Sequence, residues 1–195
     1  MKRILVFLLS AALLAPLNAL AATYSLDPAH TTIGFKVKHL MIANVKGVFE
    51  KFKGTVAIDD VDIAKSKVHV SIEMASINSN IAKRDEHLRS GDFFDVAKYP
   101  VMTFDSTKVE RTGAGALKVT GNLTIKGVTK QVILAVDGPS GEIKSPQGVV
   151  KLGASAVTTI NRQDFGVSWN KKLDAGAVVV GDEVQISIDA ELDKQ

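Results

Sequence analysis

Apolar and polar residues alternate along much of this chain, and this period-two pattern restricts the fold more than any other feature of the sequence. From Val184 to Leu192, apolar residues occupy every second position and polar residues fill the positions between them. Successive side chains of a β-strand point to opposite faces, so the pattern is typical of a strand with one dry and one wet face. The same alternation runs through residues 33–39, 68–74 and 117–125. The chain is therefore predicted to be β-rich.

Weaker versions of the alternation bring the number of predicted strands to eight. They cover residues 52–58, 102–109, 132–136 and 149–157. Turn signals separate most of the strands, and Lys126-Gly127 is the shortest break, which predicts a hairpin. Eight alternating antiparallel strands in one domain indicate a sandwich or a closed barrel, and closure removes exposed strand edges. The predicted fold class is all-β.

The beginning of the chain differs from the rest. Two basic residues precede an apolar stretch from Ile4 to Leu17, and Ala19-Leu20-Ala21 then places small residues at the −3 and −1 positions of a cleavage site. The apolar stretch is shorter than the roughly 20 residues that cross a bilayer. We therefore expect residues 1–21 to be a signal peptide that is cleaved near Ala21. Residues 22–195 are expected to form one soluble domain in the periplasm, with no integral membrane span.

Charge and cysteine content exclude several classes of protein. The signal peptide holds two of the 24 basic residues, so 22 basic residues remain against 21 acidic ones and the net charge falls to about +1. No basic stripe or run of like charges is present, and nucleic acid is therefore not a predicted partner. The absence of cysteine excludes disulfide bonds and thiolate metal sites. Stability must then come from a buried core or a closed sheet.

Two segments depart from the alternation. Residues 78–98 are densely charged and contain helix formers from Ile81 to Arg89, which predicts one or two short helices inserted between strands. A long insertion in a compact barrel is more often a lid or a rim than an unstructured loop. The second irregular stretch, residues 159–175, contains Trp169, the one tryptophan of the chain. In it, Arg162 and Asp164 are expected to hold two strand ends together through a polar turn.

Six segments are long and unusual enough to indicate a family. In chain order they are YSLDPAHTTIGFKVKHL, KGVFEKFKG, RDEHLRSGDFFDVAKYPVMTF, GNLTIKGVTKQV, INRQDFGV and VGDEVQISIDAEL. Together they resemble the YceI-like family of bacterial periplasmic proteins, across essentially all of residues 22–195. The resemblance implies an eight-stranded antiparallel lipocalin-like barrel with short helical insertions. It also implies that the barrel interior holds a polyisoprenoid or a similar long amphiphilic lipid.

The predicted ligand site combines this resemblance with the strand pattern. Inward-facing strand residues are expected to contact the lipid chain, namely Phe35, Val37, Phe52, Ile72, Met74, Phe104 and Leu123. Aromatic residues of the irregular segments are expected to cover the entrance, namely Phe93, Phe94, Tyr99 and Trp169. His39, with Arg84 or His87, is expected to hydrogen-bond a polar head group. Small inward residues such as Val70 and Ala190 would leave room along the barrel axis, and an eight-stranded barrel is wide enough for one small ligand.

Neither a metal site nor a catalytic site is predicted. His30, His39 and His87 lie in the family-like segments, but none shows the spacing of paired metal ligands, and no fourth ligand is close in sequence. A hydrolase needs a nucleophile held by its base, and no GxSxG motif is present. The simpler interpretation is a histidine paired with Asp27 or Asp85 near the barrel mouth. On the predicted helix, Asp85 and Arg89 are spaced for an ion pair.

The resulting hypothesis is a non-catalytic periplasmic carrier whose ligand is a lipid and which needs no cofactor. Two alternatives stay open at this point. One is an enzyme that acts on an isoprenoid or a quinone. The other is a stress-related interaction domain with an incidental pocket. The sequence leaves open the length of the ligand and whether the protein forms a homodimer.

Overall fold

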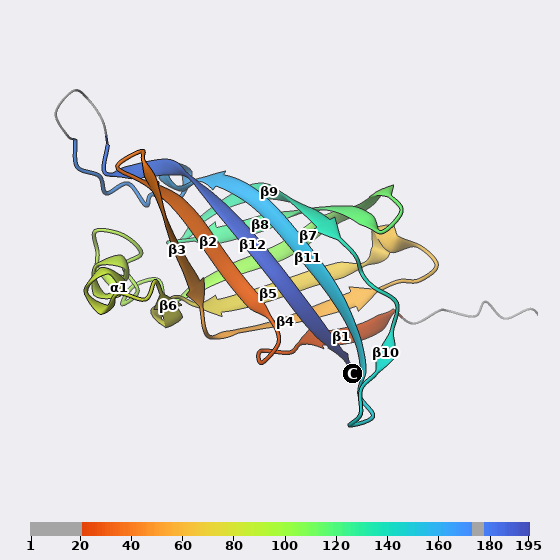
Figure 1. Ribbon diagram of the computed structural model, residues 1–195. Coiled ribbons are helices and arrows are strands. Elements are labelled where there is room, and N and C mark those ends of the chain that lie inside the picture. Colours follow the sequence, from red (N-terminus) through yellow and green to blue (C-terminus); the bar gives the residue numbers. More distant parts are fainter. Residues whose placement is uncertain (1–20, 173–177) are drawn as a thin grey trace, which may run out of the picture.

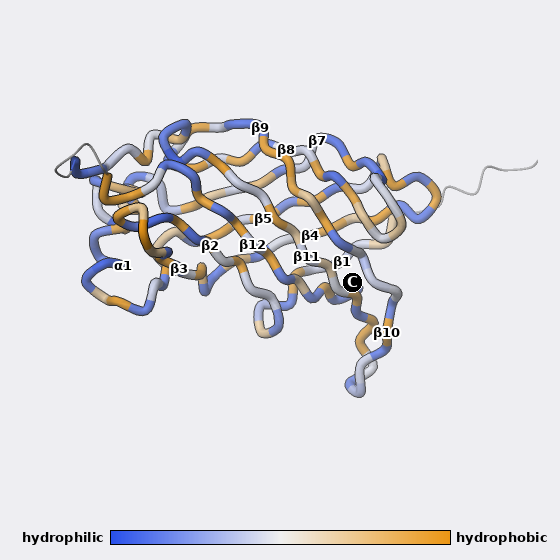
Figure 2. Tube along the Cα trace, turned by 45° about the horizontal axis from the view of Figure 1, so that its top comes forward, coloured by the Kyte–Doolittle hydropathy of each residue, from blue (hydrophilic) through white to orange (hydrophobic). Residues whose placement is uncertain are grey.

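The predicted alternation is present in the structure as strands that bury one side. The structure, a computed structural model, describes residues 21–172 and 178–195. Strand β8 (Ala116–Ile125) shows the pattern most clearly, because every second residue from Leu117 to Ile125 is buried and the residues between them are wholly or partly exposed. Figure 2 shows the same alternation of hydrophilic and hydrophobic positions along the barrel strands. The buried faces point into the barrel and form its core.

Twelve strands in the described residues make one sheet, which closes on itself (Figure 1). Besides β8 they are β1 (Ala22–Leu26), β2 (Thr32–His39), β3 (Ala43–Phe49), β4 (Phe52–Ile58), β5 (Lys67–Glu73), β6 (Ile77–Asn78), β7 (Val101–Gly113), β9 (Val128–Asp137), β10 (Ile143–Lys144), β11 (Val150–Asn161) and β12 (Val180–Lys194). Short 3-10 helices follow β4, β5 and β11, namely η1 (Ile63–Lys65), η2 (Met74–Ser76) and η3 (Arg162–Phe165).

Eleven of the twelve strands form a closed antiparallel barrel of eight strand positions, and the short β10 pairs with β11 beside it. At three positions, two strands lie one after the other along the barrel. The first position holds β1 and β2, which both pair with β12. The second holds β4, which pairs with β1, and β3, which pairs with β2; the third holds β5, which pairs with β4, and β6, which pairs with β3. The other five positions are β7, β8, β9, β11 and β12, and β12 pairs with β11 as well as with β1 and β2. Neighbours in the ring are also neighbours in the chain. The predicted eight-stranded antiparallel barrel is therefore confirmed.

Each of the eight predicted strands lies at one position of this ring. The predicted hairpin at Lys126-Gly127 is also present, because Ile125 pairs with Val128 and both turn residues have positive φ angles, of 51° and 75°. Such a turn matches the right-handed twist of the two strands that it joins. Strands β1 and β3 were not predicted. Each continues into a neighbouring strand across a short break, and the alternation is too brief in them to stand out.

The one α-helix among the described residues is α1 (Ala82–Arg89), within the predicted insertion. It lies at one end of the barrel, beside β3 and β6 (Figure 1). In the described part of the chain, only Val48 and Phe49 of β3 have a strand partner on the side facing β6. We call residues 79–99, which include α1, the mouth cap. No helix in residues 21–172 or 178–195 has the length and hydropathy of a membrane span.

Two phenylalanines lie flat against the barrel wall because the strand beside each has a glycine. Phe35 of β2 pairs with Gly47 of β3, and a Cβ atom at Gly47 would be 2.5 Å from the Phe35 ring. The ring of Phe104 on β7 covers Gly121 of β8 in the same manner. Real Cβ atoms do not come this close to a ring, so a larger residue would force either ring toward the barrel axis. These glycines therefore help to keep the interior open.

We predict that Gly121→Ala lowers the free energy of unfolding by about 1–3 kcal/mol, because the new methyl group overlaps Phe104 and the core must rearrange. Gly141→Ala is the matched control, since a Cβ atom there meets nothing within 4 Å. Urea denaturation of both variants measures the difference. Equal stability of the two variants would contradict the role assigned to Gly121.

Candidate functional site

The barrel encloses two adjoining cavities along its axis. The deep cavity has a volume of about 190 Å³ and lies away from α1, since no residue of the mouth cap lines it. The upper cavity has a volume of about 280 Å³ and lies beside the mouth cap. Both are lined by Phe35, Phe49, Met102 and Ile186, which places them end to end. Together they approach the size of the pockets that hold small-molecule ligands in proteins.

The deep cavity is lined almost completely by hydrocarbon. Its walls come from nearly every strand of the ring, and no ionisable side chain among the described residues lines it. Several lining residues are small, such as Val119, Ala154, Ala156 and Ala190. Ala154 of β11 and Ala190 of β12 are paired on neighbouring strands, so two small side chains lie side by side and project little into the cavity. The deep cavity can therefore accept apolar chains and offers a charged group no partner.

The upper cavity is also mostly apolar, but its charged side chains share one sign. Among the described residues, its only titratable lining side chains belong to Lys38, His39, Arg84, His87 and Arg162. No aspartate or glutamate of the described chain lines either cavity. Arg84 and His87 come from α1, whereas His39 ends β2 and Arg162 begins η3. Any charge complementarity at the upper cavity thus favours an anionic or hydrogen-bond-accepting group.

Polar contacts around Ser79 fix the orientation of α1. The buried carboxylate of Asp85 accepts hydrogen bonds from the backbone N–H of Ser79 at 2.9 Å and from its hydroxyl at 2.5 Å. Arg84 donates to the same hydroxyl oxygen at 2.7 Å and to the Ser79 carbonyl at 2.6 Å. Arg89 donates to the carbonyl oxygens of Ala75 and Ile77. The predicted Asp85–Arg89 pair is therefore wrong, because each side chain bonds the segment before the helix instead.

Three aromatic rings pack together at the upper cavity. The rings of Phe93 and Trp169 have centroids 5.1 Å apart, and the His87 ring lies edge-on to both with centroid distances of 5.0 Å. Nε2 of His87 is 2.8 Å from Oδ2 of Asp92, which holds the imidazole against the two rings. Edge-to-face pairs of this kind add to the stability that burial alone supplies. The cluster connects the mouth cap to the segment after β11.

Arg162 holds the segment that carries Trp169. Its buried guanidinium donates to the carbonyl oxygens of Val167 and Trp169, and to those of Val180 and Gly181 at the start of β12. Burial lowers the pKa of Arg162, which the neighbouring Asp182 carboxylate partly offsets. The predicted polar turn is therefore present, with Asp182 as the acidic partner, 3.3 Å from the guanidinium. Asp164 is exposed and does not take the role predicted for it.

Most of the residues predicted for the ligand site line one of the two cavities. Those that line the upper cavity are Phe35, Val37, His39, Arg84, His87, Phe93, Phe94 and Trp169. Those that line the deep cavity are Phe35, Ile72, Phe104 and Leu123. Their contact with a ligand stays a prediction.

Three predicted residues line neither cavity: Phe52, Met74 and Tyr99. Phe52 begins β4 at the break after β3; it is partly buried and packs against the core without lining either cavity. Met74 leaves the strand pattern because η2 bends the chain there, and it is buried in the core. The ring of Tyr99 rests on Gly127 of the β8–β9 hairpin, where a Cβ atom would be 2.7 Å away. Tyr99 thus anchors the mouth cap to the barrel.

Sequence reasoning missed several lining residues. Ile186, which lines both cavities, belongs to the strongest alternating strand and has the same parity as its inward neighbours. Phe165 and Val167, which line the upper cavity, lie in an irregular segment without any period. A parity argument could have found Ile186, whereas no simple sequence signal indicates the other two.

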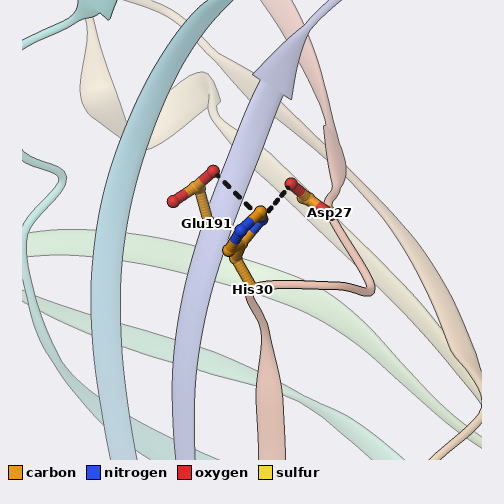
Figure 3. A group of neighbouring side chains, drawn as sticks. All are labelled: Asp27, His30 and Glu191. Carbon is orange, nitrogen blue, oxygen red and sulfur yellow. Dashed lines mark hydrogen bonds and ion pairs between the residues drawn. The ribbon is translucent and has the colours of Figure 1, made fainter. Parts of the chain in front are cut away.

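A separate polar cluster lies on the outer surface of the barrel (Figure 3). Nδ1 of His30 is 2.7 Å from Oδ2 of Asp27 and 3.6 Å from Oε1 of Glu191, so the predicted pairing with Asp27 is present, but on the outer surface and not at the barrel mouth. One imidazole and two carboxylates at this spacing could hold a metal ion. However, the ammonium of Lys151 already lies among the carboxylates, at 2.9 Å from Asp27, 2.7 Å from Glu191 and 2.6 Å from Asp193. We therefore assign the cluster to the joining of β1, β11 and β12.

The charged groups of this cluster shift one another's pKa values. Hydrogen bonds from His30 and Lys151 hold the pKa of Asp27 well below its usual range, and Asp27 in turn raises the pKa of His30. A lowered carboxyl pKa stabilises the fold above the unfolded value of about 4 and loses this contribution as pH falls. A raised histidine pKa stabilises the fold below about 6.5 and loses its contribution as pH rises through the folded value. The cluster is thus most stabilising between these two limits.

Comparison with known proteins agrees with this geometry. Residues 24–192 match the YceI-like domain. The chain belongs to the YceI-like family. It is 38% identical over 190 residues to a UPF0312 protein of Shewanella sp. (strain ANA-3), which covers 96% of this chain and 97% of that protein. It is 43% identical over 161 residues to a UPF0312 protein of Vibrio parahaemolyticus, covering 82% of this chain and 85% of that one.

Solved structures share the YceI-like barrel. BcnA of Burkholderia cenocepacia aligns with a TM-score of 0.75 at 27% identity, over 85% of this chain and 98% of that one. The YceI protein of Campylobacter jejuni aligns with a TM-score of 0.67 at 36% identity, over 87% and 96%. A polyisoprenoid binding domain from Saccharophagus degradans, implicated in plant cell wall breakdown, aligns with a TM-score of 0.62 at 18% identity, over 90% and 99%, and shares the fold.

We predict that Lys151→Met lowers the urea midpoint of unfolding at pH 7, because three carboxylates then face one another without their common cation. The difference from the unmodified protein is expected to shrink below pH ~4, where carboxylates become protonated. Lys65→Met is the matched control, since it removes only an exposed pair at 3.6 Å. A loss of stability that does not depend on pH would contradict the electrostatic role.

A second prediction concerns the aromatic cluster. His87→Ala is expected to shift the fluorescence of Trp169 to longer wavelength, because water then reaches the indole face that His87 covers. The expected loss of stability is about 0.5–1.5 kcal/mol. His69→Ala is the control, because His69 pairs with Asp105 at 2.6 Å on the outer barrel wall, far from any tryptophan contact. An unchanged emission spectrum in the His87 variant would contradict the cluster.

Proposed function

We propose that this YceI-like protein is a non-catalytic carrier that holds a long amphiphilic lipid of the polyisoprenoid type inside its barrel. The observation that carries the proposal is the deep cavity, which is lined by apolar residues, has no ionisable side chain among the described residues and continues into the upper cavity. Apolar surface removed from water contributes roughly 25 cal/mol per Å², less the cost of ordering the chain. A long hydrocarbon chain is the ligand that gains most from such a space.

The lining also suggests the direction in which the lipid is inserted. The hydrocarbon chain would lie in the deep cavity against residues such as Phe104 and Leu123. The head group would stay in the upper cavity, near His39, Arg84 and His87. A few polar groups placed at one end of an apolar pocket are enough to fix the orientation of a ligand. Because the charged lining residues are basic, the head group is expected to be anionic or a hydrogen-bond acceptor.

The fold supports a lipid as ligand. The Saccharophagus degradans domain, whose barrel aligns with this one, is described as polyisoprenoid binding. At 18% identity that likeness concerns the architecture, and the choice of a polyisoprenoid for this chain rests on the cavity lining together with the family.

The polar groups of the upper cavity support binding in preference to catalysis. The guanidinium groups of Arg84 and Arg162 donate hydrogen bonds to backbone carbonyl oxygens and to the Ser79 hydroxyl, and the His87 imidazole is hydrogen-bonded to Asp92. General acid–base catalysis needs a proton donor or acceptor placed on the reacting atoms. Here Arg84 and His87 position the mouth cap and Arg162 positions the Trp169 segment, whereas the His39 side chain has no carboxylate within ion-pair distance in the described part of the chain to act with it as a catalytic pair. We therefore propose a carrier that releases its ligand unchanged.

We further propose that the carrier works in the periplasm. Residues 1–20 lie outside the described residues, so this part of the proposal rests on the sequence pattern of a signal peptide cleaved near Ala21. Lipids that pass between two membranes must cross water, and a closed barrel with an apolar interior shields a hydrocarbon chain on that path.

Native mass spectrometry of the protein purified from the periplasm, followed by solvent extraction, tests the proposal. The protein is expected to carry a reproducible isoprenoid lipid. Ala190→Phe, which fills the deep cavity, is expected to lose it. Ala135→Phe is the matched control, because Ala135 lies on the exposed face of β9. An empty barrel, a random mixture of fatty acids, or a ligand retained in the Ala190 variant would overturn the proposal.

A further inference from the structure

The tip of the β2–β3 hairpin exposes apolar side chains at the mouth end of the barrel. Met41 is 53% exposed and Ile42 is 82% exposed, and Leu40 beside them is half-buried. The turn begins after His39, the last residue of β2, and leads into β3, which includes Val45; His39 and Val45 both line the upper cavity. The exposed tip therefore lies directly outside the place where a ligand would enter or leave. Contiguous apolar surface of this kind usually marks a contact with a partner or a membrane.

The turn does not require these residues for its own geometry. Leu40 and Met41 have φ angles of 51° and 60°, in the left-handed region. Turns of this type strongly prefer Asn-Gly, because in the left-handed region the Cβ atom of an L-residue crowds a carbonyl oxygen; Gly has no Cβ atom, and Asn offsets the cost with local hydrogen bonds. Large apolar residues at both positions oppose the local preference of the backbone, although Leu40 is only half-buried and Met41 is exposed. Their presence indicates that the side chains act outside the fold.

Lysines surround the apolar tip. Every charged residue of the hairpin is a lysine, namely Lys36, Lys38 and Lys46. The segment that precedes β12 adds Lys171 and Lys172, both exposed. It lies beside the tip, because Leu40 N–H donates to the Val179 carbonyl at 2.9 Å and Val179 N–H donates to the Lys171 carbonyl at 3.1 Å. Two acidic residues follow on β12: Asp182 is paired with Arg162, and Glu183 is exposed, so the lysines outnumber the free acidic group.

We propose that this hairpin docks the protein on the surface of an anionic phospholipid bilayer, with Met41 and Ile42 inserted among the lipids and the lysines on the head groups. Apolar residues flanked by basic ones are the composition that binds a membrane interface. A second copy of the chain fits less well, because a symmetric contact would bring lysines against lysines. Docking would place the upper cavity against the bilayer, so that a lipid could pass between them without crossing water.

The opposite end of the barrel provides an internal comparison. Val61, in the turn between β4 and β5, is 81% exposed, which is close to the exposure of Ile42. Its charged neighbours Asp59, Asp60 and Asp62 are acidic, so an anionic surface would repel it. Exposure is therefore similar at the two turns and charge is opposite. A bilayer with anionic head groups would select the β2–β3 hairpin.

Co-sedimentation with vesicles tests the proposal. The protein is expected to bind vesicles of phosphatidylglycerol and phosphatidylcholine in equal amounts, and to bind pure phosphatidylcholine weakly. The double change Met41→Ser and Ile42→Ser is expected to weaken binding at least about tenfold, since each inserted CH₂ contributes to the partition. Val61→Ser is expected to bind as the unmodified protein does. Lys171→Gln with Lys172→Gln, or ~1 M salt, is expected to reduce the binding to anionic vesicles.

A second variant separates docking from folding. Leu40→Asn with Met41→Gly gives the turn its preferred residues, so this variant is expected to melt at a higher temperature and yet to bind vesicles less. Ala190→Phe is expected to dock normally, because docking does not depend on what the deep cavity holds; this distinguishes a failure of docking from a failure of the carrier proposal. Absence of binding to anionic vesicles, or equal binding by the Met41/Ile42 and Val61 variants, would overturn the inference. A dimer that Met41→Ser with Ile42→Ser abolishes would also overturn it.

Discussion

The barrel depends on the pairing of β12 along both of its edges. One edge pairs with β11 from Asp193 to Glu183, and the other pairs with β1 and then with β2. Once this ring is closed, its strands are paired along much of their length, and the inward side chains decide whether the interior is filled. Alanines on the facing strands β11 and β12, and phenylalanines held flat by glycines, leave the axis open. The cavity is thus a consequence of closure combined with small or displaced side chains.

The parity of the strand residues predicted most of the fold, because in a closed ring every strand has one face toward the interior and one toward the outside. The alternation in β8 and β12 placed Leu123 correctly inside, and the outer position of His69 followed from the same rule. Parity failed where the backbone left the extended conformation. Met74 lies in η2 and not in β5, and the sequence pattern does not reveal where one begins and the other ends. The pattern does not reveal the position of a residue along the barrel axis either: Phe52 was predicted to face a ligand but lines neither cavity.

The mouth was harder to predict, because its charged residues act on backbone groups that have no sequence signature. The sequence spacing of these residues does not indicate their partners. The three-dimensional course of the chain brings backbone carbonyl oxygens to Arg84, Arg89 and Arg162. The pairing of His30 with Asp27 was predictable, since the two are near in sequence. The position of Lys151 between three carboxylates was not, because those residues come from distant strands.

The incomplete edge of β3 has a consequence for how the barrel could widen. Along a long pairing such as that of β11 with β12, separating the two strands breaks a ladder of backbone hydrogen bonds. Among the described residues, 43–47 of β3 have no such ladder on the side of β6, and the mouth cap is tied to the barrel through single contacts such as those of Arg89 and Lys126. These contacts can be broken one at a time, without any change of strand register. Moving the mouth cap away from β3 would therefore break fewer backbone hydrogen bonds than separating β11 from β12, and the rest of the ring would stay closed.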